Sequence, residues 1–279
     1  MPLRINIVVA LPSEARPIIE HLSLRHERTN GGMKFYRCEN ISLVVSGVGK
    51  TASAMAVGFL AALADSEDRH IWLNVGIAGH ATLPIGTLII AHTVTDHATG
   101  RSLYPSIVFN LPCQSHPVRC FDQPSMDYPF NAICDMESAA FYAAASRITE
   151  VEFTQILKIV SDNSESDIRA LDRDKIVSLV EENLGALDAT LAALVILDKK
   201  HRPEPPRPAL DQLTSRWHFT VTQQAQLRDA ARRWALLRPQ NSWPPMDELR
   251  TCGKARDVLS HLVNMLATER IRVNSGFRR

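Results

Sequence analysis

The sequence predicts an α/β protein: a three-layer α/β/α domain around a mixed, partly parallel sheet, followed by a small helical C-terminal appendage. Over residues 1–200, apolar β-rich segments alternate with helical ones, a pattern typical of sheets covered by helices on both faces. Residues 201–279 carry only helical patterns and a net charge of +7, against −6 for residues 1–200. We therefore expect two parts, residues 1–200 and residues 201–279.

The elements of the first part are predicted from apolar periodicity and turn residues. A nearly continuous apolar segment such as INIVVA at residues 5–10 is typical of a strand covered on both faces. In chain order we expect a strand at 5–10, a helix after Pro12, a hairpin at 34–49, a helix at 50–64, strands at 71–76 and 86–94, a short strand near 118–121, a strand and Ala-rich helix within 132–148, a buried strand at 153–162 and one amphipathic helix at 172–197.

The second part opens on HRPEPPRPAL at residues 201–210, whose four prolines predict a semi-rigid linker or an extended segment. Helical spacing returns at residues 220–238 and 253–271. Its arginines could form a nucleic-acid surface, but helices that pack on the acidic first part or across an oligomer interface explain them better, so we do not expect nucleic acid as a partner.

Composition narrows the class of protein. No signal peptide is evident at the N-terminus, and no apolar stretch reaches the roughly 18 residues that span a bilayer. The five cysteines form an odd set without C-x-x-C spacing, which disfavours a disulfide framework or a zinc site. There is also no dinucleotide fingerprint. We expect a cytoplasmic protein without metal, cofactor or membrane partner.

The stretch VVSGVGKTAS at residues 44–53 runs from a strand through Gly-x-Gly-Lys-Thr into a helix, as a nucleotide-binding P-loop does. In that motif a glycine must stand five residues before the Gly-Lys pair, because the backbone curls there around the phosphates. This position is Val44, a β-branched residue inside the strand. We therefore predict a tight turn shaped by Gly47 and Gly49, not a P-loop.

Four groups of motifs together resemble the nucleoside phosphorylase-like superfamily, and more closely its nucleosidase branch. They are IVVALPSEARPII, VVSGVGKTASAMAVGFL, WLNVGIAGHATLPIGTLII, and CDMESAAFYAAA with ILKIVSDNSESD. The resemblance covers about residues 3–197 in family order, and nothing comparable covers residues 201–279. It implies a mixed sheet with the site at the strand ends, a purine nucleoside as small-molecule partner, and a homodimer or higher homo-oligomer.

The resemblance also implies roles for individual residues. Asp162 matches the aspartate that protonates or hydrogen-bonds the purine, and Glu14 matches the glutamate that activates water. Glu137 matches the glutamate on the ribose hydroxyls, and Met136 matches the methionine beside the sugar. Cleavage of an N-glycosidic bond needs these functions: an acid for the departing base, charge stabilisation of the sugar and an activated nucleophile.

The remaining candidates for substrate binding are Ser161, Ile77, Ala78, Gly79, Phe121 and Gln123. The sequence departs from the family at Ile77, where a hydroxyl residue is usual, and at Lys158, where an arginine is usual. The segment between Tyr104 and Cys134 is also short, so Phe121, Asp122 and Gln123 are proposed for the wall that stacks on the base.

These observations predict an N-glycosidase that hydrolyses a purine nucleoside, with a 5′-modified ribose of the methylthioadenosine type as one option. Two alternatives stay open. The first is a phosphorylase on the same scaffold. The second is a catalytically weak nucleoside-binding or regulatory module, which Ile77 and the short base segment favour.

Overall fold

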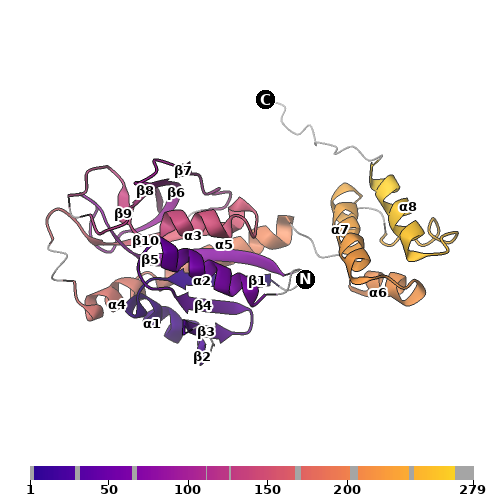
Figure 1. Ribbon diagram of the computed structural model, residues 1–279, viewed down its shortest axis with the longest axis horizontal. Helices are drawn as coiled ribbons and strands as arrows, with labels where there is room; N and C mark the ends of the chain where they lie inside the picture. Colours follow the sequence, from indigo (N-terminus) through magenta and orange to yellow (C-terminus); the bar gives the residue numbers. More distant parts are fainter. Residues whose placement is uncertain are drawn as a thin grey trace. The chain divides into compact units, whose positions relative to one another are not determined.

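The computed structural model describes residues 3–28, 32–64, 68–110, 112–125, 127–166, 171–201, 207–238 and 242–267. The chain divides into two compact units, residues 1–195 and residues 196–279. In the first unit, helices cover both sides of a mixed sheet, and the second unit is helical (Figure 1). The predicted fold class is confirmed.

Within the described residues, one mixed sheet of ten strands organises the first unit. Its hydrogen-bonded order is β10-β6-β8-β9-β5-β1-β4-β3-β2, with β7 paired to β6. The strands are β1 Leu3–Val9, β2 Arg25–Glu27, β3 Lys34–Cys38, β4 Ile41–Val45, β5 Arg69–Gly79, β6 Leu88–Asp96, β7 Ser102–Leu103, β8 Gln114–Cys120, β9 Ile133–Asp135 and β10 Thr154–Asp162.

The sheet closes on itself around β5. This strand pairs in parallel with β1 and with β10, and in antiparallel with β9, while β10 also pairs with β6. Because β4, β1, β5 and β10 are all parallel to one another along this path, their carboxyl ends meet at one edge. In α/β sheets this edge is the usual place for a ligand site.

Helices pack on both faces of the sheet. The α2 helix packs against α3, and α1 packs against α4 (Figure 1). Alternation along β10 separates the two faces: Ile156 and Val160 join the core under α2 and α3, whereas Leu157 and Ile159 meet side chains of the α4 and α5 region. The helices are α1 Pro12–His21, α2 Lys50–Ala62, α3 Ser138–Ala145, α4 Arg173–Glu181 and α5 Leu184–His201; η1 Val151–Phe153 is a 3₁₀ turn.

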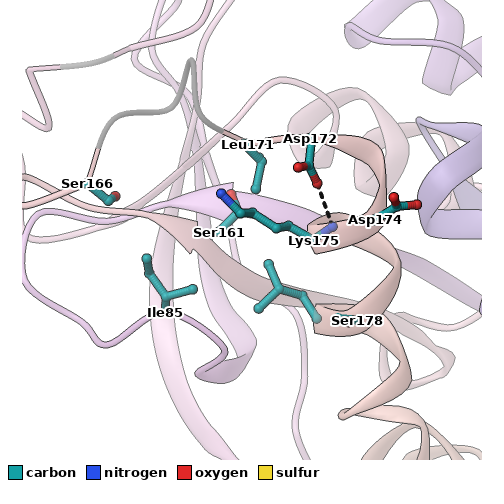
Figure 2. A pocket seen from close by; sticks show the side chains of 9 residues that line it. Ile85, Ser161, Ser166, Leu171, Asp172, Asp174, Lys175 and Ser178 are labelled. Carbon is teal, nitrogen blue, oxygen red and sulfur yellow. Dashed lines mark hydrogen bonds between the residues drawn. The ribbon is translucent and has the colours of Figure 1, made fainter.

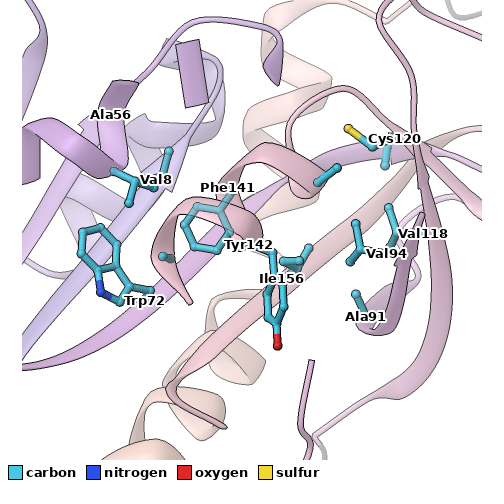
Figure 3. Packing of buried hydrophobic residues seen from close by; sticks show 14 of the residues in the cluster. Val8, Ala56, Trp72, Ala91, Val94, Val118, Cys120, Phe141, Tyr142 and Ile156 are labelled. Atoms are coloured by element: carbon cyan, nitrogen blue, oxygen red, sulfur yellow. The ribbon is translucent and has the colours of Figure 1, made fainter. Parts of the chain in front are cut away.

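The main core lies between the sheet and the helices α2 and α3. Trp72 and Phe141 are fully buried in it, together with small residues of α2 such as Ala56 (Figure 3). Small residues on α2 and α3 let the two helices approach each other and the sheet closely. This packing fixes the start of α3, where several site residues lie.

Two predicted elements differ from the structure. The single helix expected at 172–197 is two helices, because the Asn183 side chain donates to the carbonyl of Leu179 and the chain turns there. The strand expected at 118–121 begins earlier, at Gln114, and contains Pro117. Its pairing with β6 shifts register next to Pro117, and a proline without an N–H is tolerated at such an irregularity.

The second unit contains three described helices, α6 Arg207–Arg216, α7 Val221–Leu237 and α8 Ala255–Ala267. The helix α6 was not expected, because proline runs predict a linker over 201–210; residues 202–206 of that stretch lie outside the described residues. Thr220 caps α7 and exchanges hydrogen bonds with Gln223. The apolar core of this unit includes Leu213, Trp217, Leu227, Trp234, Leu259 and Leu262. In the described part of the chain, no helix has both the length and the apolar character needed to cross a bilayer.

Truncation of Phe141 tests the importance of the α3 contact with the sheet. Phe141→Ala leaves a cavity in a fully buried position, so we expect a loss of about 3–5 kcal/mol in unfolding free energy. Urea denaturation followed by circular dichroism measures this loss. Met55→Ala on the exposed face of α2 is the control and should change stability by less than about 0.5 kcal/mol. Equal stabilities of the two variants would contradict the assignment of the core.

Candidate active site

A pocket of about 230 Å³ lies at the edge where the carboxyl ends of the parallel strands meet. Nine of the ten residues predicted for the site line it: Glu14, Ile77, Ala78, Gly79, Phe121, Met136, Glu137, Ser161 and Asp162. They come from segments far apart in the sequence, which the sheet order brings together. Gln123 is the exception, because its side chain is exposed and is not part of the lining.

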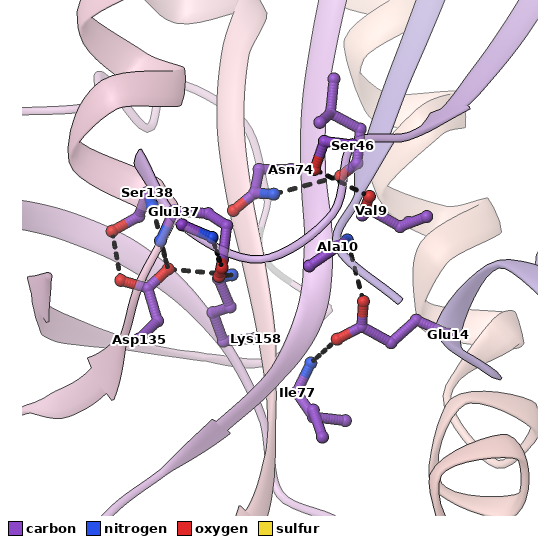
Figure 4. A network of polar contacts seen from close by, with 12 residues as sticks. Val9, Ala10, Glu14, Ser46, Asn74, Ile77, Asp135, Glu137, Ser138 and Lys158 are labelled. Atoms are coloured by element: carbon purple, nitrogen blue, oxygen red, sulfur yellow. Dashed lines mark hydrogen bonds and ion pairs between the residues drawn. The ribbon is translucent and has the colours of Figure 1, made fainter. Parts of the chain in front are cut away.

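Glu14 is placed by the first turn of α1, which begins directly after β1. Its carboxylate accepts hydrogen bonds from the backbone N–H groups of Ala10 at 3.0 Å and Leu11 at 2.7 Å. The other oxygen accepts from the N–H of Ile77 at 2.9 Å, at the end of β5 (Figure 4). Ile77 thus serves the site through its backbone, although its side chain lacks the usual hydroxyl.

Glu14 is only 2% exposed. Burial raises its pKa above the ordinary value, and the hydrogen bond from Ile77 and the charge of Lys158 oppose this rise only in part. Gly76 is needed beside it, since a Cβ there would lie 2.8 Å from the Glu14 Oε1 atom. Glu14 is therefore a buried carboxyl held in one orientation, with a raised affinity for a proton.

Lys158 lies on β10 and is the buried cation of the site. Its Nζ atom lies 2.9 Å from Asp135 Oδ2 and 3.8 Å from Glu137 Oε2 (Figure 4). Burial by itself would lower the pKa of Lys158, but the charges of Asp135, Glu137 and Glu14 raise it above its ordinary value. The ammonium therefore stays protonated and partly neutralises a cluster of carboxylates.

Glu137 precedes α3 and faces the glycine turn. Its Oε1 atom accepts a hydrogen bond from the N–H of Gly49 at 2.8 Å. Gly47 and Gly49 have φ values of 86° and 104°, a region that L side chains rarely adopt, which explains the two glycines. Burial raises the pKa of Glu137, and Lys158 opposes this effect. The predicted turn therefore positions a carboxylate.

Asp135 and Tyr128 hold residues of the site in place and were not among the predicted site residues. Asp135 accepts from the backbone N–H of Ser138 at 2.9 Å and from the Ser138 hydroxyl at 2.7 Å, which fixes the start of α3. An aspartate three residues before such a serine is a signal of a helix start, and it was available in CDMES. Tyr128 is the other residue, and its hydroxyl donates a hydrogen bond to the carboxylate of Asp162.

Asp162 ends β10, and its carboxylate also accepts a hydrogen bond from the Ser161 hydroxyl. Gly79 packs against it: a Cβ at that position would lie 2.5 Å from Asp162 Oδ2. The N–H of His80 donates to the Asp162 carbonyl at 3.0 Å. Asp162 is thus fixed by its side chain and by its backbone, with its carboxyl at the pocket.

Several polar residues near these motifs lie outside the pocket lining. Asp122 pairs with Lys50 at 2.9 Å, and His97 packs on the ring of Phe121 with 4.4 Å between centroids. His80 accepts the N–H groups of Thr82 and Leu83 at Nδ1, so a proton at that atom is disfavoured. Among the described residues, no group of three or more His, Cys, Asp or Glu side chains is arranged to hold a metal ion.

A second, larger pocket of about 500 Å³ shares Ser161 and Leu171 with the first. Asp172, Asp174 and Lys175 at the start of α4 line it on one side (Figure 2). The Asp172 carboxylate caps the helix by accepting the N–H of Lys175 at 2.8 Å. The first pocket is therefore adjoined, next to Asp162, by a second pocket that carries charged groups of both signs.

The family model described as the phosphorylase superfamily matches residues 4–128 of the chain. This match confirms the resemblance predicted from the motifs. No curated protein matches the sequence.

Solved structures with a similar fold include two nucleosidases and a futalosine hydrolase. A 5′-methylthioadenosine/S-adenosylhomocysteine nucleosidase from Helicobacter pylori is 16% identical with a TM-score of 0.57, covering 69% of this chain and 99% of that chain. The corresponding enzyme from S. pneumoniae is 22% identical with a TM-score of 0.54, covering 68% and 99%. A futalosine hydrolase from Helicobacter pylori is 18% identical with a TM-score of 0.55, covering 68% and 97%. At these identities the likeness establishes the fold.

The raised pKa values of the buried carboxyls predict how the unfolding free energy depends on pH. Glu14 and Glu137 have pKa values raised above the ordinary 4.5. Above that pH the folded protein keeps protons that the unfolded chain has released, so the unfolding free energy should fall as the pH rises. Glu14→Gln removes one such group, and we expect it to lose less stability than the wild type between about pH 5 and 8, by about 1.4 kcal/mol for each unit of raised pKa.

Urea denaturation at a series of pH values measures this difference. Glu20→Gln on the exposed side of α1 is a matched control, because its carboxylate pairs only with Arg16 at the surface among the described contacts. Its pH dependence should follow that of the wild type. A Glu14→Gln curve that runs parallel to the wild-type curve would contradict a buried Glu14 with a raised pKa.

Proposed function

We propose that the protein hydrolyses the N-glycosidic bond of a purine nucleoside and releases the base and the sugar. One observation carries this proposal: Glu14, Glu137 and Asp162, from three distant segments, line a single pocket at the carboxyl edge of the sheet. Such a bond needs an acid for the base, negative charge near the sugar and a base for water. Each carboxylate is suited to one of these tasks.

In the proposed reaction, Asp162 gives its proton to the purine as the bond between C1′ and N9 breaks, and the bonding electrons leave with the base. Water attacks C1′ and passes a proton to Glu14. The raised pKa of Glu14 supports this role, since a carboxylate with higher proton affinity is a stronger general base. Glu137 holds the ribose hydroxyls and stabilises the positive charge that develops on the sugar.

The electrostatics of the pocket favour water over phosphate as the nucleophile. Four carboxyl residues line it, Glu14, Asp135, Glu137 and Asp162, and none of the described lining residues is a lysine or an arginine. The buried Lys158 is engaged with Asp135 and Glu137. Phosphate would need cationic groups that face the pocket. These features support hydrolysis over the phosphorylase alternative.

The related structures support the nucleoside class. One Helicobacter pylori nucleosidase was solved with 5′-methylthioadenosine in its active site, and the S. pneumoniae enzyme was solved with a transition-state inhibitor. The ligand of that Helicobacter pylori structure supports a 5′-modified ribose of the methylthioadenosine type as one option for the substrate. A homo-oligomer and a cytoplasmic location stay predictions of the sequence.

An assay of base release tests the function and Asp162 together. We expect the wild type to release the base from adenosine, inosine or methylthioadenosine without phosphate, and Asp162→Asn to lower kcat by about 10²–10⁴-fold with the fold retained. Chromatography of the products with and without phosphate provides the measurement. Strict phosphate dependence with ribose 1-phosphate as product would establish a phosphorylase instead, and tight binding without base release would establish a nucleoside-binding module.

Glu14→Gln tests the water-activating role. The amide keeps the shape of the side chain but cannot take a proton, so kcat should fall by about 10²–10⁴-fold while substrate affinity changes little. Glu20→Gln on the same helix is the matched control and should keep full activity. A Glu14→Gln variant with wild-type turnover would remove Glu14 as the base.

A further inference from the structure

Tyr128 contacts Asp162 from inside the protein. Its hydroxyl donates a hydrogen bond to Asp162 Oδ2, and the Ser161 hydroxyl donates to Oδ1. Asp162 lines the pocket, whereas Tyr128 is only 8% exposed and is not part of the lining. The phenol therefore holds a carboxyl that lines the pocket without lining the pocket itself.

The surrounding chain is built to keep this contact. Tyr128 has a φ of 40°, in the left-handed region that a bulky residue adopts only at a cost in free energy. Its ring packs with Phe121 and Cys134 in a small apolar cluster. Gly79 closes against it, because a Cβ there would lie 2.5 Å from the Tyr128 ring and equally close to Asp162 Oδ2. Several separate segments thus fix the pair.

We propose that Tyr128 is a positioning residue of the reaction, which aims the Asp162 carboxyl at the purine and stabilises the negative charge left on it when its proton passes to the departing base. This inference rests on the proposed function. Nothing in the family motifs of the sequence indicates it, since Tyr128 lies in the shortened segment between β8 and β9.

The chemistry follows from the change of charge on Asp162. Before proton transfer, the two hydroxyl groups donate to a neutral carboxyl. As the proton moves to the purine and the C1′–N9 bond breaks, a carboxylate forms, and hydrogen bonds to an ionised acceptor are about twice as strong as bonds to a neutral one. The Tyr128 bond is therefore stronger in the transition state than in the ground state, which is the condition for an effect on kcat.

The phenol is a suitable donor over the whole neutral range. Burial and the hydrogen bond to Asp162 raise the pKa of Tyr128 above its ordinary value, so the hydroxyl keeps its proton. A phenylalanine would fill the same volume in the cluster with Phe121 and Cys134 but would remove the donor. The substitution Tyr128→Phe thus isolates the hydrogen bond.

The deciding experiment compares two leaving groups. With the purine nucleoside that the wild type cleaves, kcat of Tyr128→Phe should fall about 10–100-fold with KM within about twofold, the size expected for one hydrogen bond to a charged group. With 4-nitrophenyl β-D-ribofuranoside, whose phenolate leaves without a proton, wild type and variant should react at the same rate. Equal losses on both substrates would indicate a merely structural role, and no loss on either would also overturn the proposal.

Tyr142→Phe is the matched control. Tyr142 is another buried tyrosine, 3% exposed, whose hydroxyl donates to the carbonyl of Tyr104 at 3.1 Å, away from the pocket lining. Its loss should leave both reactions unchanged. A wild type that cleaves no nucleoside would refute the proposed function itself, whereas an active wild type with an equally active Tyr128→Phe variant would refute the role of Tyr128 alone.

A tyrosine titration tests the contact without turnover. The difference in ultraviolet absorbance between wild type and Tyr128→Phe at alkaline pH isolates the ionisation of Tyr128. Asp162→Asn removes the carboxylate that opposes this ionisation, so Tyr128 should ionise at lower pH in that background. The same ionisation curve in both backgrounds would show that the phenol does not face the Asp162 charge, and the proposal would fall.

Discussion

The ion pairs of the buried Lys158 ammonium are the interaction on which the site depends. Its Nζ atom lies within 4 Å of both Asp135 and Glu137, and its charge also acts on Glu14. Burying several carboxylates together is costly unless a counter-charge is present. The lysine ammonium is a compact positive charge between these carboxylates, whereas an arginine would present a planar, bidentate guanidinium. The pocket can therefore be both acidic and buried.

One strand, β10, connects the charge balance to the chemistry. Lys158 and Asp162 are four residues apart on this strand, and its pairing with β5 shifts register between Val160 and Asp162, so simple alternation ends before the aspartate. The strand is buried along its whole length. Parallel pairing with β5 then brings Asp162 next to Gly79, whose missing side chain leaves room for the carboxyl. The pairing of β10 with β5 therefore both closes the sheet and assembles the site.

Alternating strand and helix patterns predict the fold class, whereas the resemblance of the motifs to a known family names nine residues that line the pocket. These residues meet because the carboxyl ends of the parallel strands share one edge of the sheet. The contact of Tyr128 with the site could not be predicted from the sequence, because the position of this residue depends on a left-handed backbone and on contacts with distant segments. Gln123 does not line the pocket, and its place could not be derived because periodicity does not set the path of a short proline-rich loop. The break at Asn183 was missed because a side-chain hydrogen bond to the backbone, not a proline or glycine, ends the helix pattern.

The turn at Gly47 and Gly49 has a consequence for anions. Its backbone N–H at Gly49 points to an acceptor just before the N-terminus of α2, an arrangement that commonly receives a phosphate. Here the acceptor is the carboxylate of Glu137, which belongs to the same chain. The loop that resembles a nucleotide cradle already holds its anion, so an external phosphate would have to displace a covalently tethered competitor. Resemblance to a phosphate loop can thus mark a place from which phosphate is excluded.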